Sequence, residues 1–159
     1  MAYPIRQADF NTTPSQQARQ RLTADGFRLA AGTTGYRPQP LNAAIVPGAI
    51  SSPITIKWQA DGIVLNLYGS VNVTDPATID QAMMSIGVRV SMCGVTELFT
   101  DGYSPNYAIL GTILNRAQNA YYVGQPVKSG DIWTITYKNE NASLSILPDC
   151  TFDFAELAR

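Results

Sequence analysis

The segment Ser85-Ile86-Gly87-Val88-Arg89-Val90-Ser91-Met92 has the clearest strand pattern of the chain. Four large apolar side chains alternate in it with small or polar ones. Because successive side chains of a strand point to opposite faces of a sheet, this alternation predicts a strand with one buried and one exposed face. The protein is therefore expected to contain at least one half-buried β-sheet.

The same period of two appears earlier in the chain. Residues 54–58 (ITIKW) alternate apolar and polar side chains, and residues 63–68 (IVLNLY) form a second apolar run. Between them, residues 59–62 (QADG) end in a glycine, which can adopt the positive φ that tight turns require. Two strand-like runs around a short turn predict a β-hairpin.

The last third of the chain repeats this arrangement. Residues 131–137 (DIWTITY) and 143–147 (SLSIL) are strand-like, and residues 138–141 (KNEN) between them are turn-like. Phe152 and Phe154 predict a final short strand. Several short strands separated by turns are typical of a sandwich or barrel. We expect a mainly all-β protein with an antiparallel, jelly-roll-like β-sandwich.

Two other segments are less regular. Asp75-Pro76 predicts a loop or one helical turn. Residues 107–121 contain apolar side chains at helical spacing, but Gly111 weakens a helix, and residues 108–114 also resemble a buried strand. We expect strands there, with 115–119 as a hairpin loop, and a helix is the open alternative.

Residues 1–52 differ from the body at 53–159 and predict an extended N-terminal arm that contains a short helix. The sequence Thr13-Pro14-Ser15-Gln16 combines the spacing of a capping box with a proline at the first helical position. Gly26 marks the expected end of this helix. Its weak apolar face, with Ala18 and Leu22, indicates that the helix docks on another surface.

The remainder of the arm is rich in proline and glycine, yet it keeps apolar and aromatic residues that a disordered linker would lack. We therefore expect it to be ordered against a surface, either its own or a partner's. Residues 1–40 hold five Arg and two Asp, whereas the whole chain has a net charge of −1. The arm residues expected to contact a partner are Tyr3, Ile5, Phe10, Arg19, Arg21, Phe27, Arg28, Tyr36, Arg37 and Leu41.

Composition limits the classes of partner. Charged residues make up 14% of the chain, against a typical ~25%. Arginine and aromatic side chains interleave in the arm, as in segments that bind single-stranded nucleic acid, but so small a positive charge fits a solvated helix face better. No run approaches the ~20 apolar residues of a membrane span. We expect neither nucleic acid nor a membrane as a partner.

Catalytic patterns are missing from the sequence. The absence of histidine removes the commonest general base and the commonest metal ligand. Asp101 and Asp131 lie in turn-like settings, where aspartate usually serves the turn. Neither a Gly-rich phosphate-binding pattern nor a Gly-x-Ser-x-Gly nucleophile pattern occurs. The protein is therefore not expected to be an enzyme, and no catalytic residue, metal or cofactor is expected.

Cysteines and tryptophans leave two alternatives open. Cys93 follows an apolar strand pattern and is expected to fill the core, although a disulfide bridge to Cys150 is an alternative. Strand aromatics are expected mainly in the core or at an interface. The alternative is a sugar-binding platform, in which Trp58 and Trp133 would face the ligand.

In overall organisation the chain resembles the small head decoration (cement) proteins of tailed bacteriophages. It shares their size, an arm of about the first third, and a low-charge, Thr/Asn-rich β body with turns such as Val127-Lys128-Ser129-Gly130-Asp131. The resemblance implies a structural virion protein on the capsid surface, made in the host cytoplasm without a secretion signal. It also implies homotrimers whose arms bind the major capsid protein and other copies. The alternatives are a carbohydrate- or receptor-binding β-sandwich module of a virion and a small jelly-roll coat protein.

Overall fold

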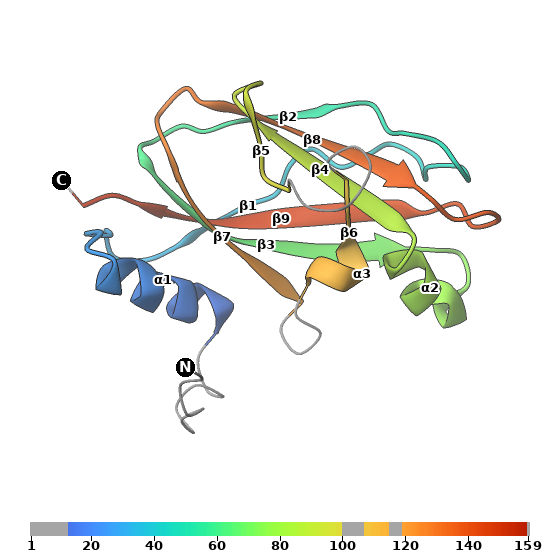
Figure 1. Ribbon diagram of the computed structural model, residues 1–159, viewed down its shortest axis with the longest axis horizontal. Coiled ribbons are helices and arrows are strands. Elements are labelled where there is room, and N and C mark those ends of the chain that lie inside the picture. Colours follow the sequence, from blue (N-terminus) through green and yellow to red (C-terminus); the bar gives the residue numbers. More distant parts are fainter. Residues whose placement is uncertain (1–12, 100–106, 115–118, 159) are drawn as a thin grey trace.

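The structure, a computed structural model, describes residues 13–99, 107–114 and 119–158. Two antiparallel sheets pack face to face, and one helix covers the outer side of the first sheet (Figure 1). The strands are β1 (Thr34–Tyr36), β2 (Ile54–Lys57), β3 (Gly62–Asn72), β4 (Ile86–Met92), β5 (Thr96–Glu97), β6 (Ala108–Ile109), β7 (Ala120–Val127), β8 (Ile132–Asn139) and β9 (Leu147–Glu156). The helices are α1 (Pro14–Ala24), α2 (Ile79–Met83) and α3 (Leu110–Ile113), and a 3-10 turn at Pro76–Thr78 precedes α2.

The strand order is that of a jelly roll. The first sheet has the order β1-β9-β3-β7, and the second has the order β2-β8-β4-β5, with β6 also beside β4. Strands pair from the two ends of the chain inward: β1 with β9, β2 with β8, β3 with β7 and β4 with β6. The chain is thus one long antiparallel hairpin rolled into two sheets, and the expected jelly-roll-like β-sandwich is confirmed.

The two predicted local hairpins are wrong. Strands β2 and β3 lie in different sheets, and so do β8 and β9. The turn before β3 does not close a hairpin, because its groups bond to the turn before β8. The Trp58 N–H donates to the Asp131 carbonyl at 2.9 Å, and the Ser129 N–H donates to the Asp61 carboxylate at 2.8 Å. The turn therefore carries the chain from one sheet to the other.

The main core lies between the sheets and is formed by their inner faces. From β4 it receives the apolar side chains of the alternating segment, all of them buried. An aromatic cluster fills one part of this core: the Trp58 ring lies 5.3 Å from Trp133 and 5.4 Å from Phe154, between ring centroids. Edge-to-face and offset contacts of this kind add to the free energy gained by burying the rings.

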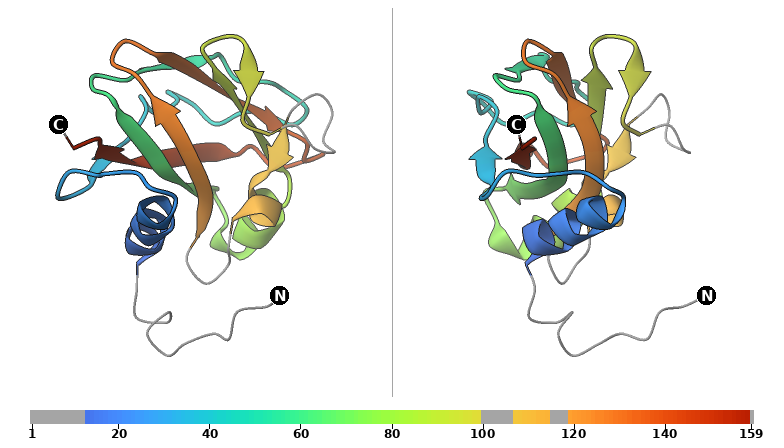
Figure 2. Two further views of the ribbon diagram at one scale, coloured as in Figure 1. Left: turned by 60° about the vertical axis from the view of Figure 1, so that its left-hand side comes forward. Right: turned by 90° about the vertical axis from the view of Figure 1, so that its left-hand side faces the viewer.

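Helix α1 forms a third layer on the outer face of the first sheet (Figure 2). The predicted capping box is present, because the Thr13 hydroxyl accepts from the Gln16 N–H and the Gln16 side chain accepts from the Thr13 N–H. Ala18 and Leu22 are buried in a second apolar cluster with the β3 residues Ile63 and Leu65. The described part of the predicted arm is therefore built into the body and is not a separate unit beside it.

Strand β1 reinforces this conclusion. It belongs to the predicted arm, yet Thr34–Tyr36 pairs with β9 and completes the edge of the first sheet. The boundary expected at residue 52 consequently falls within one fold, in the connection between β1 and β2. Sequence reasoning missed β1 because three residues are too few to show an alternation.

Three further sequence predictions differ from the structure. Residues 107–121 combine strand β6, the short helix α3 and the start of β7, so neither alternative is right for the whole segment; residues 115–118 lie outside the described residues. Residues 143–146 form no strand beyond an Ile146 bridge to Ile45, and Leu147 begins β9, which is longer than the predicted last strand. Cys93 is exposed in the turn after β4, Cys150 is buried, and both thiols are free.

Candidate binding groove

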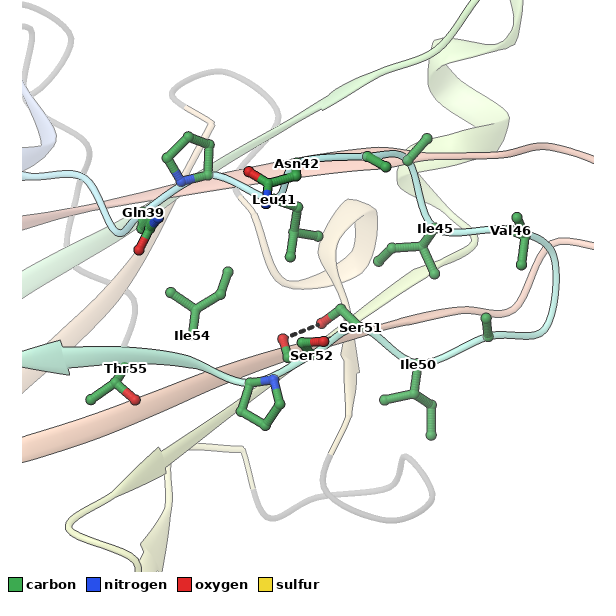
Figure 3. A pocket seen from close by; sticks show the side chains of 15 residues that line it. Gln39, Leu41, Asn42, Ile45, Val46, Ile50, Ser51, Ser52, Ile54 and Thr55 are labelled. Atoms are coloured by element: carbon green, nitrogen blue, oxygen red, sulfur yellow. Dashed lines mark hydrogen bonds between the residues drawn. The ribbon is translucent and has the colours of Figure 1, made fainter.

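An open groove of about 660 Å³ lies along one edge of the sandwich (Figure 3). It is formed by the long connection between β1 and β2, which doubles back on itself. The outgoing wall, residues 39–46, follows the first sheet through the Ile45–Ile146 bridge, and the returning wall, residues 49–55, follows the second sheet through the Ile50–Lys138 bridge. The groove is therefore the opening between the two sheets, and it has the size of a typical ligand or peptide site.

The turn between the two walls is fixed by buried polar contacts. Asn139, at the end of β8, is fully buried and donates to the carbonyls of Ile45 at 2.8 Å and Leu144 at 2.7 Å. Gly48 has a φ of +76°, which a residue without a side chain adopts freely, and its N–H donates to the Asn139 carbonyl at 2.9 Å. A side chain and a glycine thus hold the walls apart at one end.

The lining of the groove is uncharged and mixes apolar residues with Gln39, Asn42, Ser51, Ser52 and Thr55. Figure 3 shows Leu41 and Ile54 pointing into the space between the walls from opposite sides. Val46 and Ile50, at the closed end, are each 57% exposed. The polar lining residues include Gln39, whose side-chain amide has no hydrogen-bond partner among the described residues.

The outgoing wall also offers main-chain groups. From Gln39 to Ala44, no main-chain N–H or carbonyl has a protein partner within the described part of the chain. Pro38 and Pro40 favour an extended backbone here, since each excludes the helical region for the residue before it. The chain bends at Asn42 and Ala43, and Pro40 has no N–H, so this wall offers free main-chain groups but no continuous strand edge.

The arm residues predicted to contact a partner lie in different surroundings, and most of the described ones contact their own chain. Arg19 donates to the carbonyls of Gly32 and Ala30 at 2.7 and 2.6 Å, and Arg21 lies over the Tyr122 ring at 5.0 Å. These contacts hold α1 against its following loop and β7, and the binding of a partner by Arg19 and Arg21 stays a prediction.

Three of the remaining described arm residues also contact their own chain. Phe27 packs against the α1 cluster, Tyr36 lies 5.4 Å from Trp58, and Arg37 forms a 2.6 Å ion pair with Asp149. Arg28 is exposed, and its side chain has no partner within the described ranges. Leu41 is the predicted residue that lines the groove. Tyr3, Ile5 and Phe10 lie outside the described residues.

The proposed ligand-facing tryptophans are buried. Trp58 is 2% and Trp133 is 1% exposed, and both belong to the main core, so neither can stack on a ligand at the surface. The alternation that predicts their strands puts them on the same face as Ile56 and Ile135. This observation removes the basis for the sugar-binding platform.

A polar cluster joins α1 to the first sheet. The Asp153 carboxylate accepts from Ser15, from Asn66 at 3.4 Å and from the Tyr68 hydroxyl at 2.7 Å. Burial, assisted by Asp153, raises the pKa of Tyr68 to about 12. A register shift in β3 between Val64 and Asn66 marks an irregularity next to this cluster. The contacts attach the start of the helix to β3 and β9.

Sequence reasoning missed most of the groove. It noted the apolar residues of this connection without assigning them to one site, and it named only Leu41 as a contact residue. The available signal was an uncharged stretch, residues 39–55, that contains three prolines and is flanked by charged residues at 37 and 57. Within the described residues, no group of three acidic or cysteine side chains could hold a metal ion. No described helix is long and apolar enough to cross a membrane.

Comparisons with known proteins give no family for this chain. No family model matches it, and no curated protein matches it. Among solved structures, it is similar to FlhE, with 12% identity and a TM-score of 0.40 over 79% of this chain and 99% of that one. It is also similar to an exo-β-1,3-galactanase from Phanerochaete chrysosporium solved with galactose, with 15% identity and a TM-score of 0.35 over 78% of this chain and 30% of the galactanase. Both scores are low, so the assignment to the jelly-roll sandwiches rests on the strand order of the chain itself.

Proposed function

We propose that this protein is a structural component of a virion, which binds the outside of a phage capsid and stabilises it by protein–protein contacts. The proposed partners are the major capsid protein and other copies of this chain. The copies would form a homotrimer. The observation that carries it is the uncharged groove at the open edge of the sandwich, with Val46 and Ile50 exposed at its closed end. These two side chains lie together on one groove and offer a partner protein apolar surface to cover.

The energetics of the groove fit this role. Burial of apolar surface contributes about 25 cal/mol per Å², and a fully buried valine or isoleucine side chain contributes about 1.5–3 kcal/mol. Val46 and Ile50 are each more than half exposed, so each can contribute roughly half of that range on binding. A shell presents many copies of the same contact, and small contributions repeated by symmetry can stabilise it against heat.

Co-sedimentation with shells assembled from the major capsid protein of the same source tests the proposal. We expect the protein to sediment with the shells and to raise their temperature of disruption. Val46→Asp combined with Ile50→Asp should abolish binding, because it places two charges in a desolvated contact. Val95→Asp is the matched control, since Val95 is 88% exposed in the β4–β5 turn, away from the groove. Failure of the wild-type protein to bind, or full binding by the double variant, would refute this function.

The strand order favours a second candidate, a small jelly-roll coat protein, because viral coat domains commonly have this architecture. The two candidates differ in what the purified chain does alone. A coat protein would assemble into shells, whereas a decoration protein would remain a small oligomer. Light scattering and native mass spectrometry of the purified chain distinguish these outcomes.

A further inference from the structure

The turn between β4 and β5 carries an exposed apolar surface. Val95 is 88% exposed, more than any other large apolar side chain of the described residues, and Ile132 on the neighbouring strand β8 is 47% exposed. The Cys93 N–H donates to the Ile132 carbonyl at 2.8 Å, which holds the turn beside β8. Cys93 and Gly94 both have a positive φ, as a tight two-residue hairpin turn requires. Val95 and Ile132 together form the tip, a surface that projects from a fixed position.

A hollow of about 510 Å³ lies beside α2. Its lining comes from the end of β3, from α2 and from α3, and it includes Ile79 and Met84, which are 42% and 51% exposed. Polar residues are also present, and Asp80 is the charged residue of this lining. Methionine side chains are unbranched and adapt to the shape of a partner. The hollow can therefore accept an apolar side chain beside an acidic rim.

The tip and the hollow lie at opposite ends of one strand. Helix α2 precedes β4, and the turn that carries the tip follows it, as Figure 1 shows. The seven residues of β4 span about 23 Å, so the tip cannot enter the hollow of its own copy. A contact between the two surfaces joins different copies head to tail, and such contacts generate a closed ring or a filament.

Charge favours contact of a tip with a hollow over contact of like surfaces. Lys57 is exposed and lies beside Ile132 in the register of β2 and β8. Within the described ranges, neither Lys57 nor Asp80 has an ion-pair partner. Asp61 and Asp131, at the same end of the sandwich as the tip, accept main-chain N–H groups of the turn before β8 at 2.8 and 2.9 Å. A head-to-tail contact brings opposite charges together, whereas two tips or two hollows would bring like charges together.

We propose that the tip of one copy inserts Val95 into the hollow of the next copy, with Lys57 facing Asp80 across the rim. The inference deepens the proposed function, because it rests on other copies of this chain as partners and names the surfaces that join them. A closed ring of three such contacts forms the proposed homotrimer. Val46 and Ile50 belong to neither surface, so the groove stays free for the capsid protein.

Sedimentation velocity of the full-length protein tests this inference. We expect the wild-type protein to associate, and Val95→Asp to weaken the association about 100-fold or more, because it puts a charge into a desolvated contact. Val46→Asp is the matched control, since Val46 is an exposed valine outside the tip and the hollow, and it should associate like the wild type. A wild-type protein that stays monomeric, or Val95→Asp that associates as tightly as the control, would overturn the proposal.

A charge exchange tests the rim of the contact. Lys57→Asp and Asp80→Lys should each weaken association about threefold to tenfold, because each places like charges across the rim. The variant that carries both substitutions should associate within about threefold of the wild type, since opposite charges face each other again. If the combined variant were as weak as the single ones, Lys57 would not face Asp80, and the head-to-tail pairing would be wrong.

The native thiol of Cys93 gives a separate readout at the tip. Ser70 is exposed and lines the hollow, so Ser70→Cys should form a disulfide with Cys93 of another copy under mild oxidation. Ser52→Cys is the control, because Ser52 is exposed in the groove and should not bond to Cys93. Peptide mapping by mass spectrometry identifies the bond. Its absence, or equal bonding in the control, would contradict the contact.

Failure of this inference and failure of capsid binding give different results. Val95→Asp should still bind shells through the groove, as single copies. The Val46→Asp and Ile50→Asp double variant should lose shell binding and keep the association between copies. Shell binding by a wild-type protein that does not self-associate would overturn the tip contact alone, and self-association without shell binding would overturn the capsid proposal alone.

Discussion

Replacement of Leu22 by alanine tests whether α1 is a layer of the fold or a detachable arm. Leu22 is 2% exposed and lies in the cluster that α1 forms with β3 and Ala155. Buried leucine-to-alanine substitutions cost about 2–5 kcal/mol. A surface helix can move partly into the space left by the side chain, so we expect a loss of about 2–3 kcal/mol in the free energy of unfolding. In a protein of this size, that loss lowers the melting temperature by roughly 4–12 °C.

Urea unfolding followed by tryptophan fluorescence is the appropriate assay. Trp58 and Trp133 are both in the main core and report unfolding of the two sheets. Gln20→Ala is the control, because Gln20 is exposed on α1, and its replacement should change the free energy by less than about 0.5 kcal/mol. If Leu22→Ala were as stable as the control, the helix would not contribute to the fold, and our assignment of the arm would be wrong.

Three further predictions concern the sheet, the thiols and the pH dependence. Gly62→Ala should destabilise the protein by about 1–3 kcal/mol, because its Cβ would overlap a carbonyl and a phenyl ring of β9, whereas Gly35→Ala has open space and should be tolerated in the same urea assay. A thiol reagent should label Cys93 in the native protein and Cys150 only after unfolding, since Cys150 is buried and burial raises its thiol pKa to about 12. Mass spectrometry measures the labelling. If both thiols of the native protein were labelled, the core packing around Cys150 would be contradicted. The raised pKa of Tyr68 means that the fold favours the neutral phenol, so its contribution to stability is complete below about pH 10 and is lost as the pH rises towards 12. The Tyr68→Phe variant should therefore lose less stability than the wild-type protein over that interval. If urea unfolding showed the same pH dependence for both proteins, this role of Tyr68 would be refuted.

Local patterns predicted elements well and their pairing poorly. The alternation from Ile86 to Met92 correctly predicted β4, and the Thr13–Gln16 capping box correctly predicted the start of α1. Alternation fixes the face on which a side chain lies, but it carries no information about the neighbouring strand. The partner of Ile54 is Ile135, far along the chain, so the predicted hairpin could not be distinguished from a connection between two sheets.

The alternation of apolar and polar residues could also have corrected the predictions for three single residues. Trp58 and Trp133 are in phase with the apolar residues of their strands, which indicates burial. Cys93 is out of phase with Met92, which indicates the exposed side, and the structure places it in a turn with a φ of +55°. The groove could not be predicted in this way, because it depends on two walls that are held by different sheets.

The pairing of strands from the chain ends inward has a consequence for synthesis on the ribosome. Thr34 of β1 pairs with Phe154 of β9, so the first strand has to wait for the last one. At a translation rate of about 5–20 residues per second, this wait is roughly 6–24 s. Until then β3 has β7 as a neighbour but lacks its long partner β9, and the first sheet cannot close. Non-local pairing of this kind also slows folding after release, so the nascent chain is expected to need protection against aggregation for longer than a helical protein of equal length.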